Sequence, residues 1–290
     1  MESNKKERNR NSADPIHPSN RQAAIGVFDS GVGGLTVIKQ IAKALPDEDC
    51  IYLGDTARIP YGTKSRDTIR RFALKNSEFL VSLGIKYLVV ACNTAASAGL
   101  DIISEKFDIP VIGVILPGAK RAVKVTKNKR VGIIGTRTTT ESGAYEREIK
   151  NLSSNIRVYA TSCPLFVPLA EEGWTENEVA YLVAREYLGG LIDKNVDTLL
   201  LGCTHYPLLK KVIAETMGFD VNIVDSAVPI AREVKENLER LGLTLEAPAE
   251  NSRNRKLKFF VTDDPKSFVR VGEPFLGLEI DDVEHVDIAV

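Results

Sequence analysis

The sequence predicts an α/β protein with two pseudo-symmetric parallel-sheet domains of similar topology and the active site between them. Two observations favour this class. Short apolar runs typical of buried parallel strands alternate with helical patterns, and four of these runs recur in order later in the chain. With 290 residues, 43% of them hydrophobic, the chain is long enough for two domains of ordinary size.

The recurring strands match one another at nearly constant separation, between 106 and 112 positions. The matched pairs are residues 25–30 with 131–136, 51–55 with 157–161, 88–94 (LVVACNT) with 199–205 (LLLGCTH), and 111–115 with 223–227. Any two buried parallel strands resemble each other in composition, but that explains one match rather than four in register. We therefore expect two similar units, each with helices crossing over between its strands.

Helical patterns fill the intervals between these strands. Ser65 can cap a helix with apolar periodicity that ends before Gly84. In the second unit, Thr175 and Glu178 have capping-box spacing ahead of another apolar-striped run. Gly189 and the glycine after it are expected to weaken or bend this second helix before its end.

The ends of the chain differ in composition from its middle. Residues 1–22 hold five basic and three acidic residues and almost no apolar ones, which predicts a flexible tail. Residues 246–256 are polar and predict a loop, whereas residues 257–261 are typical of a late strand. We expect the end of the chain to return to the first unit. The domains would then be residues 23–116 plus 228–290, and residues 117–227.

Charge and hydropathy disfavour several classes of partner. The chain carries 38 basic and 39 acidic residues, so no overall field favours nucleic acid or an anionic membrane. No apolar run has the length of a membrane span or the form of a secretory signal, which predicts a cytoplasmic protein with reduced thiols. Small molecules or other proteins are the expected partners.

Cysteine spacing disfavours a disulfide scaffold and a metal site. The four cysteines, Cys50, Cys92, Cys163 and Cys203, include no C-x-x-C pair. Cys203 and His205 are the only close Cys and His pair, and no second pair has the spacing of metal ligands. We expect no metal, and we interpret Cys50 and Cys163 as structural.

Cys92 and Cys203 occupy matching positions in the repeat, each directly after an apolar strand. The carboxyl ends of parallel strands are where open α/β sheets hold their ligands. The neutral donors Asn93, Thr94 and Thr204 follow at helix starts, where anions are stabilised and the pKa of a thiol is lowered. A single buried cysteine is often inert, but two in matching positions favour a site with a thiol on each side of its substrate.

Two loops at other strand ends offer backbone donors. Residues 29–34 (DSGVGG) allow N–H groups to approach an anion at a helix start. The dinucleotide fingerprint is incomplete, because Thr36 stands where its third glycine is needed, so nucleotide binding is disfavoured. Residues 55–62 form a turn-rich loop, and its backbone near Tyr61 and Gly62 is available to a carboxylate.

His205 lies two residues after Cys203, which gives it two interpretations. Histidines often serve only as polar packing groups. At this position, His205 could instead tune or relay the proton of the thiol. Glu171 and Glu172 are most simply solvated, but one of them could reach the site as a partner of His205.

Taken together, these motifs resemble the cofactor-independent aspartate/glutamate racemase superfamily and, within it, the glutamate racemases. The matching segments are residues 26–35, 60–62, 91–95, 163–168, 202–207 and 224–226. The resemblance implies interconversion of L- and D-glutamate without a cofactor, supplying D-glutamate for peptidoglycan. A homodimer with glutamate as its small-molecule partner is expected.

The resemblance also assigns roles to individual residues. Cys92 and Cys203 match the two catalytic cysteines, one acting on each enantiomer, while Asp29, His205 and Glu171 match positions that assist proton transfer. The implied substrate-binding positions are Asp29, Ser30, Tyr61, Gly62, Asn93, Thr94, Thr136, Thr204 and His205. Residues 262–265 depart from a glycine-containing turn of the family, and the N-terminal extension leaves activation by a cell-wall precursor open.

Three alternatives stay open from the sequence. An aspartate racemase would use the same chemistry on a shorter side chain. A non-catalytic amino-acid-binding protein could use the same scaffold. A decarboxylase of the superfamily can work with one thiol, so the presence of two cysteines counts against it.

Overall fold

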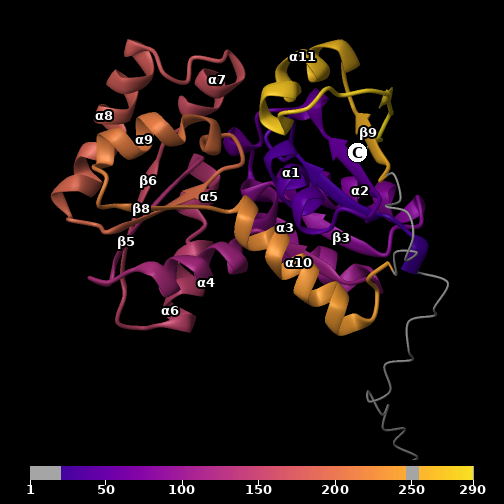
Figure 1. Ribbon diagram of the computed structural model, residues 1–290, viewed down its shortest axis with the longest axis horizontal. Helices are drawn as coiled ribbons and strands as arrows, with labels where there is room; N and C mark the ends of the chain where they lie inside the picture. The colour runs from indigo at the N-terminus through magenta and orange to yellow at the C-terminus, as the bar shows by residue number, and fades with distance from the viewer. Residues whose placement is uncertain (1–20, 246–254, 290) are drawn as a thin grey trace, which may run out of the picture.

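The computed structural model describes residues 21–245 and 255–289, which form two lobes, each built on a parallel β-sheet (Figure 1). The predicted α/β class with two parallel sheets is confirmed. Of the tail predicted at residues 1–22, all but the last two residues lie outside the described ranges. Of the loop predicted at residues 246–256, only residues 255 and 256 lie inside them.

The first sheet has six parallel strands in the order β10-β9-β2-β1-β3-β4. These are β1 (Ile25–Asp29), β2 (Cys50–Gly54), β3 (Tyr87–Val90), β4 (Val111–Gly113), β9 (Leu257–Val261) and β10 (Val283–His285). Strand β9 pairs with β2, and β10 pairs with β9. The last part of the chain therefore completes the sheet that the first part begins.

The second sheet has four parallel strands in the order β6-β5-β7-β8. These are β5 (Arg130–Gly135), β6 (Arg157–Ser162), β7 (Thr198–Gly202) and β8 (Asn222–Asp225). The corresponding strands of the first sheet follow the same order, β2-β1-β3-β4. The four matched sequence segments lie on equivalent strands, so the structure confirms the predicted repeat.

Helices cover the faces of both sheets (Figure 1). Those of the first half are α1 (Leu35–Ala44), α2 (Arg66–Ser82), α3 (Asn93–Lys106) and α4 (Ile115–Val125). Those of the second half are α5 (Arg137–Glu141), α6 (Ala144–Leu152), α7 (Phe166–Glu171), α8 (Glu178–Asp193) and α9 (Lys210–Met217), followed by α10 (Ala227–Leu241) and α11 (Pro265–Leu276). In the described ranges, no helix is both long enough and apolar enough to cross a membrane.

Helix starts were predicted with mixed success. The side chain of Ser65 caps α2, as predicted, by accepting a backbone N–H of the first turn at 3.3 Å. The predicted cap at Thr175 is wrong, because the Asn177 side chain accepts the N–H of Ala180 at 3.0 Å and α8 begins two residues later than the capping box implied. Asparagine is at least as good a cap as threonine. Helix α8 continues past Gly189 to Asp193.

A buried ion pair ties the end of α10 to the first sheet. The ammonium group of Lys86, which has no exposed surface, donates to Glu48 and to the carbonyls of Arg21 (2.7 Å) and Leu243 (2.9 Å). A buried charge is stable only when it is paired and hydrogen-bonded, as this one is. Although α10 follows the last strand of the second sheet, it lies along the first lobe (Figure 1).

Candidate active site

A cavity of about 280 Å³ lies between the two lobes, at the carboxyl ends of strands from both sheets. It is lined by Ser30, Ile59, Pro60, Tyr61, Gly62, Cys92, Asn93, Thr94, Thr136, Val167, Pro168, Glu171, Cys203, Thr204 and His205. All the predicted site residues are in this lining except Asp29, which is completely buried beside it. The structure therefore brings the predicted residues together around one space.

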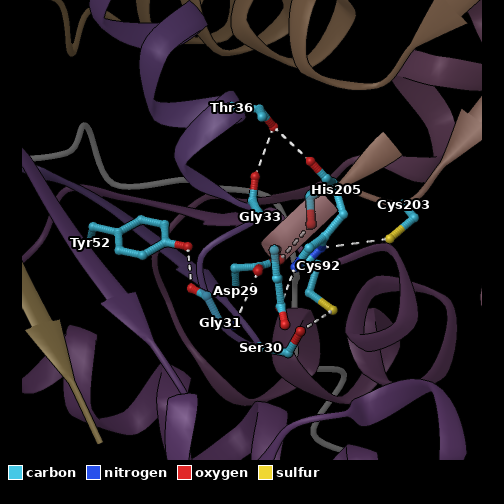
Figure 2. Close-up of polar contacts among 11 residues, drawn as sticks. Asp29, Ser30, Gly31, Gly33, Thr36, Tyr52, Cys92, Cys203 and His205 are labelled. Carbon is cyan, nitrogen blue, oxygen red and sulfur yellow. Dashed lines mark hydrogen bonds and ion pairs between the residues drawn. The ribbon is translucent and has the colours of Figure 1, made fainter. Parts of the chain in front are cut away.

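Cys92 lies at the junction of β3 and α3, as predicted. Its side chain is 4% exposed and caps α3, with its Sγ 3.5 Å from the backbone nitrogen of Ala95. The thiol also donates to the Ser30 hydroxyl at 3.5 Å (Figure 2). Cys92 thus reaches the cavity from the first lobe.

The expectation that a helix start lowers the thiol pKa is wrong for Cys92. Burial raises its pKa to about 12, and interactions with Asp29 and Cys203 add to the rise. The hydrogen bonds of Cys92 with Ala95 and Ser30 act in the opposite direction but are too weak to reverse the rise. Loss of hydration therefore outweighs the donors at the helix start, and Cys92 carries its proton at neutral pH.

Cys203 reaches the cavity from the second lobe, directly after β7. Its Sγ lies 3.9 Å from Nδ1 of His205, which the dashed line in Figure 2 marks. The following helix begins three residues further on, as a short 3₁₀ helix at Tyr206–Leu209, so Cys203 does not cap a helix as Cys92 does. The two thiols occupy equivalent strand ends in different surroundings.

His205 bridges Cys203 and Glu171. Its Nε2 lies 2.8 Å from a carboxylate oxygen of Glu171, on the other side of the ring from the thiol. Burial by itself favours the neutral imidazole, but the hydrogen bonds with Cys203 and Glu171 raise the pKa of His205 to about 10. His205 is therefore protonated at neutral pH, and Glu171 is its partner among the two candidate glutamates.

Asp29 accepts a hydrogen bond from the glycine-rich loop of residues 29–34. Its carboxylate accepts the N–H of Gly31 at 3.1 Å (Figure 2). It also accepts the hydroxyl hydrogen of Thr204 at 3.2 Å. Burial raises the pKa of Asp29, although the nearby charge of His205 and these hydrogen bonds oppose the rise. The carboxyl group beside this loop thus belongs to an aspartate of the chain itself, which interacts with both Cys92 and His205.

Two glycines allow the lobes to approach each other at the cavity. A Cβ added at Gly33 would lie 2.4 Å from Oγ1 of Thr204 and 2.5 Å from Nδ1 of His205. A Cβ added at Gly62 would lie 2.6 Å from the Cβ of Thr136. Real Cβ atoms essentially never come so close, so any larger residue would displace groups that line the cavity.

Hydroxyl groups of both lobes meet at the cavity wall. Oγ1 of Thr94, in the first lobe, lies 2.9 Å from Oγ1 of Thr136 and 3.2 Å from Oγ1 of Thr139, both in the second lobe. Thr139 is buried and was not predicted from the sequence. It extends the contact between the lobes.

Several other contributors were also missed. Ile59, Pro60, Val167 and Pro168 give the cavity an apolar wall, and the two prolines belong to motifs noted in the sequence. Tyr61 donates to the buried carboxylate of Asp55, and the Asn76 amide donates to Tyr61 at 3.0 Å. The ring of Phe275, on α11, packs edge-on against His205 with centroids 5.3 Å apart. No local pattern marks Asn76 or Phe275 as a support of the site, because each belongs to a helix outside the motifs.

The chemistry available in this cavity is proton transfer. It combines two thiols from opposite lobes, a His–Glu pair and neutral donors, and none of its lining residues is Lys or Arg. In the described part of the chain, no group of three or more His, Cys, Asp or Glu side chains could hold a metal ion. A small molecule seated between the thiols would present one face to each of them.

Comparison with known proteins agrees with this arrangement. The family model of Asp/Glu/hydantoin racemases matches residues 25–234. The chain is 56% identical to the glutamate racemase of Geobacter metallireducens, over 91% of this chain and 97% of that protein.

Two solved structures are similar as well. The glutamate racemase of Francisella tularensis, solved in complex with D-glutamate, has a TM-score of 0.86 and 41% identity, covering 92% of this chain and 98% of that one. The Escherichia coli glutamate racemase, in complex with L-glutamate and the activator UDP-MurNAc-Ala, has a TM-score of 0.75 and 29% identity, covering 92% and 100%. The chain therefore belongs to the Asp/Glu/hydantoin racemase family, among the glutamate racemases, and is an amino-acid racemase.

Proposed function

We propose that this racemase interconverts L- and D-glutamate by a two-base mechanism in which Cys92 and Cys203 act on opposite faces of the α-carbon. The observation that carries the proposal is that the two thiols line one cavity from equivalent strand ends of the two lobes. The similar structures with D-glutamate and with L-glutamate support glutamate as the substrate.

The reaction removes a proton from one face of the α-carbon and adds a proton to the opposite face. A thiolate on one face takes the α-proton, so the C–H bond breaks, an S–H bond forms, and the electron pair is delocalised into the carboxylate. The opposite thiol then gives its proton to the other face. Donors from Asn93 and Thr94 are suited to stabilise the charge that grows on the carboxylate, whereas the Thr204 hydroxyl already donates to Asp29.

Cys92 needs help to become a base, because burial raises its pKa to about 12. The substrate brings an α-ammonium group, and a positive charge close to Cys92 and Asp29 favours the thiolate. Once formed, a thiolate in a cavity that excludes water is a stronger base than a hydrated one. Substrate binding thus favours ionisation of Cys92, which the reaction requires.

The other residues divide into two roles in this proposal. Asp29, His205 and Glu171 assist proton transfer, Asp29 beside Cys92 and the His205–Glu171 pair beside Cys203. The remaining contacts bind and orient the substrate through hydroxyl, amide and backbone groups. These binding residues are Ser30, Tyr61, Gly62, Asn93, Thr94, Thr136 and Thr204.

We further propose that the reaction supplies D-glutamate for peptidoglycan and takes place in the cytoplasm. A mechanism with two thiols needs both cysteines reduced, which a reducing compartment ensures. The homodimer expected from the resemblance stays a prediction, and light scattering after size-exclusion chromatography tests it.

The test is racemisation of D-glutamate without added cofactor, followed by circular dichroism. We expect turnover by the unaltered enzyme, and a loss of at least about 10²- to 10⁴-fold in Cys92→Ala and in Cys203→Ala, the contribution usual for an acid or base. Cys50→Ala is the matched control, because it removes an equally buried thiol outside the cavity and should keep normal turnover.

Two outcomes would count against the proposal. Near-normal turnover in either cavity variant would contradict the two-base mechanism. Turnover of D-aspartate in place of D-glutamate would identify an aspartate racemase instead.

A further inference from the structure

Tyr145 links the two lobes directly behind the cavity without lining it. It lies on α6 of the second lobe and is only 2% exposed. Its hydroxyl donates to Oδ1 of Asn93, in the first lobe, at 2.5 Å. Asn93 is the residue after Cys92 and does line the cavity.

The ring of Tyr145 also lies against the strand end that carries the other thiol. A Cβ added at Gly202, the residue before Cys203, would be 3.1 Å from Cε2 of this ring. A Cβ added at Gly118, on α4, would be 3.2 Å from its Cε1. The ring therefore fills space that larger residues at both glycines would need. One side chain thus contacts the residue before Cys203 and the residue after Cys92.

The hydrogen bonds of the Asn93 carboxamide show which way it faces in the structure. A carboxamide has an acceptor oxygen and a nitrogen with two donor hydrogens. The oxygen takes the Tyr145 proton, and the nitrogen donates one hydrogen to Oγ of Ser226 at 3.5 Å. Burial raises the pKa of Tyr145 far above its ordinary value, so the hydroxyl keeps at neutral pH the proton that it donates to Asn93. The second amide hydrogen of Asn93 is not used by these bonds.

We propose that Tyr145 is a positioning residue, which holds Asn93 so that its free amide hydrogen is directed at the substrate carboxylate. The proposal rests on the racemase function proposed above. Without the hydroxyl, the amide can turn over and present its oxygen to the carboxylate, where charge grows as the α-proton leaves. Tyr145 would thus act on the rate through Asn93, without touching the substrate.

The first test compares Tyr145→Phe with the unaltered enzyme in the glutamate racemisation assay. We expect kcat to fall about 10- to 100-fold in both directions, somewhat less than the loss of a donor that touches the transition state, with KM changed less than about threefold. Tyr87→Phe is the matched control. It removes a buried tyrosine hydroxyl that accepts a 2.9 Å hydrogen bond from Asn237. Tyr87 begins β3, at the end of the strand away from Cys92, and does not line the cavity, so this variant should keep normal kinetics.

The second test is a double-mutant cycle with Asn93→Ala. If Tyr145 acts through Asn93, Tyr145→Phe should lower kcat less than about twofold in the Asn93→Ala background. An equal loss with and without the Asn93 side chain would overturn the proposal, and so would normal kcat in Tyr145→Phe. Unaltered enzyme that does not racemise glutamate would instead refute the function proposed above.

A third variant keeps the proposal testable if Tyr145→Phe does not fold, as judged by its thermal unfolding transition. Asn93→Asp replaces the amide by a carboxylate, which accepts the Tyr145 hydrogen bond but offers no donor hydrogen. We expect kcat at or below that of Asn93→Ala. Near-normal kcat in Asn93→Asp would show that no donor is required there and would overturn the proposal.

Discussion

Cys92 and Cys203 occupy equivalent places in the repeat, yet their neighbours differ. Cys92 lies beside Ser30 and the buried Asp29, whereas Cys203 lies beside the protonated His205. The local sequence predicted where both thiols stand, because a strand end is a local feature. It did not predict the raised pKa of Cys92, because the degree of burial depends on the approach of the other lobe.

The interaction of His205 with Glu171 predicts a pH-dependent stability. In the folded chain the pKa of His205 is about 10, above the unfolded value of about 6.5, so the folded state binds more protons between these values. The resulting stabilisation is complete below about pH 6.5 and is lost as the pH rises towards 10. Glu171→Gln removes one cause of the raised pKa. Its deficit in unfolding free energy, relative to the unaltered chain, should be largest near pH 6.5 and shrink by pH 8.5.

Urea denaturation of both chains at several pH values between about 6.5 and 8.5 measures this difference. Unfolded thiols begin to titrate at the upper end of this range, but they do so in both chains, so their contribution cancels in the difference. Glu172→Gln is the matched control, because Glu172 is the exposed neighbour and should show no pH-dependent deficit. A deficit for Glu171→Gln that stays constant or grows with pH would contradict the conclusion that Glu171 raises the pKa of His205.

At the scale of helices and strands, the repeat made most of the fold predictable. All eight strands of the two equivalent sets were located from the sequence. The central strands β1, β3, β5 and β7 are almost completely buried and carry a strong local signal, whereas the outer strand β6 has no buried residue and was found through the repeat. Helix starts were less predictable. Thr175 and Asn177 are both acceptable caps by residue type, and the path of the preceding loop decides between them. The edge strand β10 is too short to give a pattern.

The cap of α8 can be tested by a pair of substitutions. Asn177→Ala should lower the free energy of unfolding by about 1 kcal/mol, because the N–H of Ala180 loses its partner. Thr175→Ala should change it by less than about 0.5 kcal/mol, as a loop substitution away from a cap does. Urea denaturation of both variants measures these changes. A larger loss of unfolding free energy in Thr175→Ala than in Asn177→Ala would show that Thr175 is the cap, as the sequence predicted.

At the scale of the whole molecule, the site exists because two similar lobes face each other. The division into residues 23–116 plus 228–290 and residues 117–227 stays a prediction, although β9 and β10 do join the first sheet. The close approach at Gly33 and the contact of Tyr145 with Asn93 were not predictable, because each joins segments far apart in the chain. The sequence motifs predicted which residues line the cavity, but only the fold shows which contacts position them.

The central claim is that each thiol exchanges a proton on its own face of the α-carbon. The most direct measurement is racemisation of unlabelled L-glutamate in D₂O, with deuterium at the α-carbon of each separated enantiomer determined by mass spectrometry early in the reaction. We predict deuterium in the D-glutamate product and almost none in the remaining L-glutamate, because a thiol that returns its proton gives back the one it took. D-glutamate that keeps its original α-proton would mean that a single base carries the proton between the faces, and would contradict the claim.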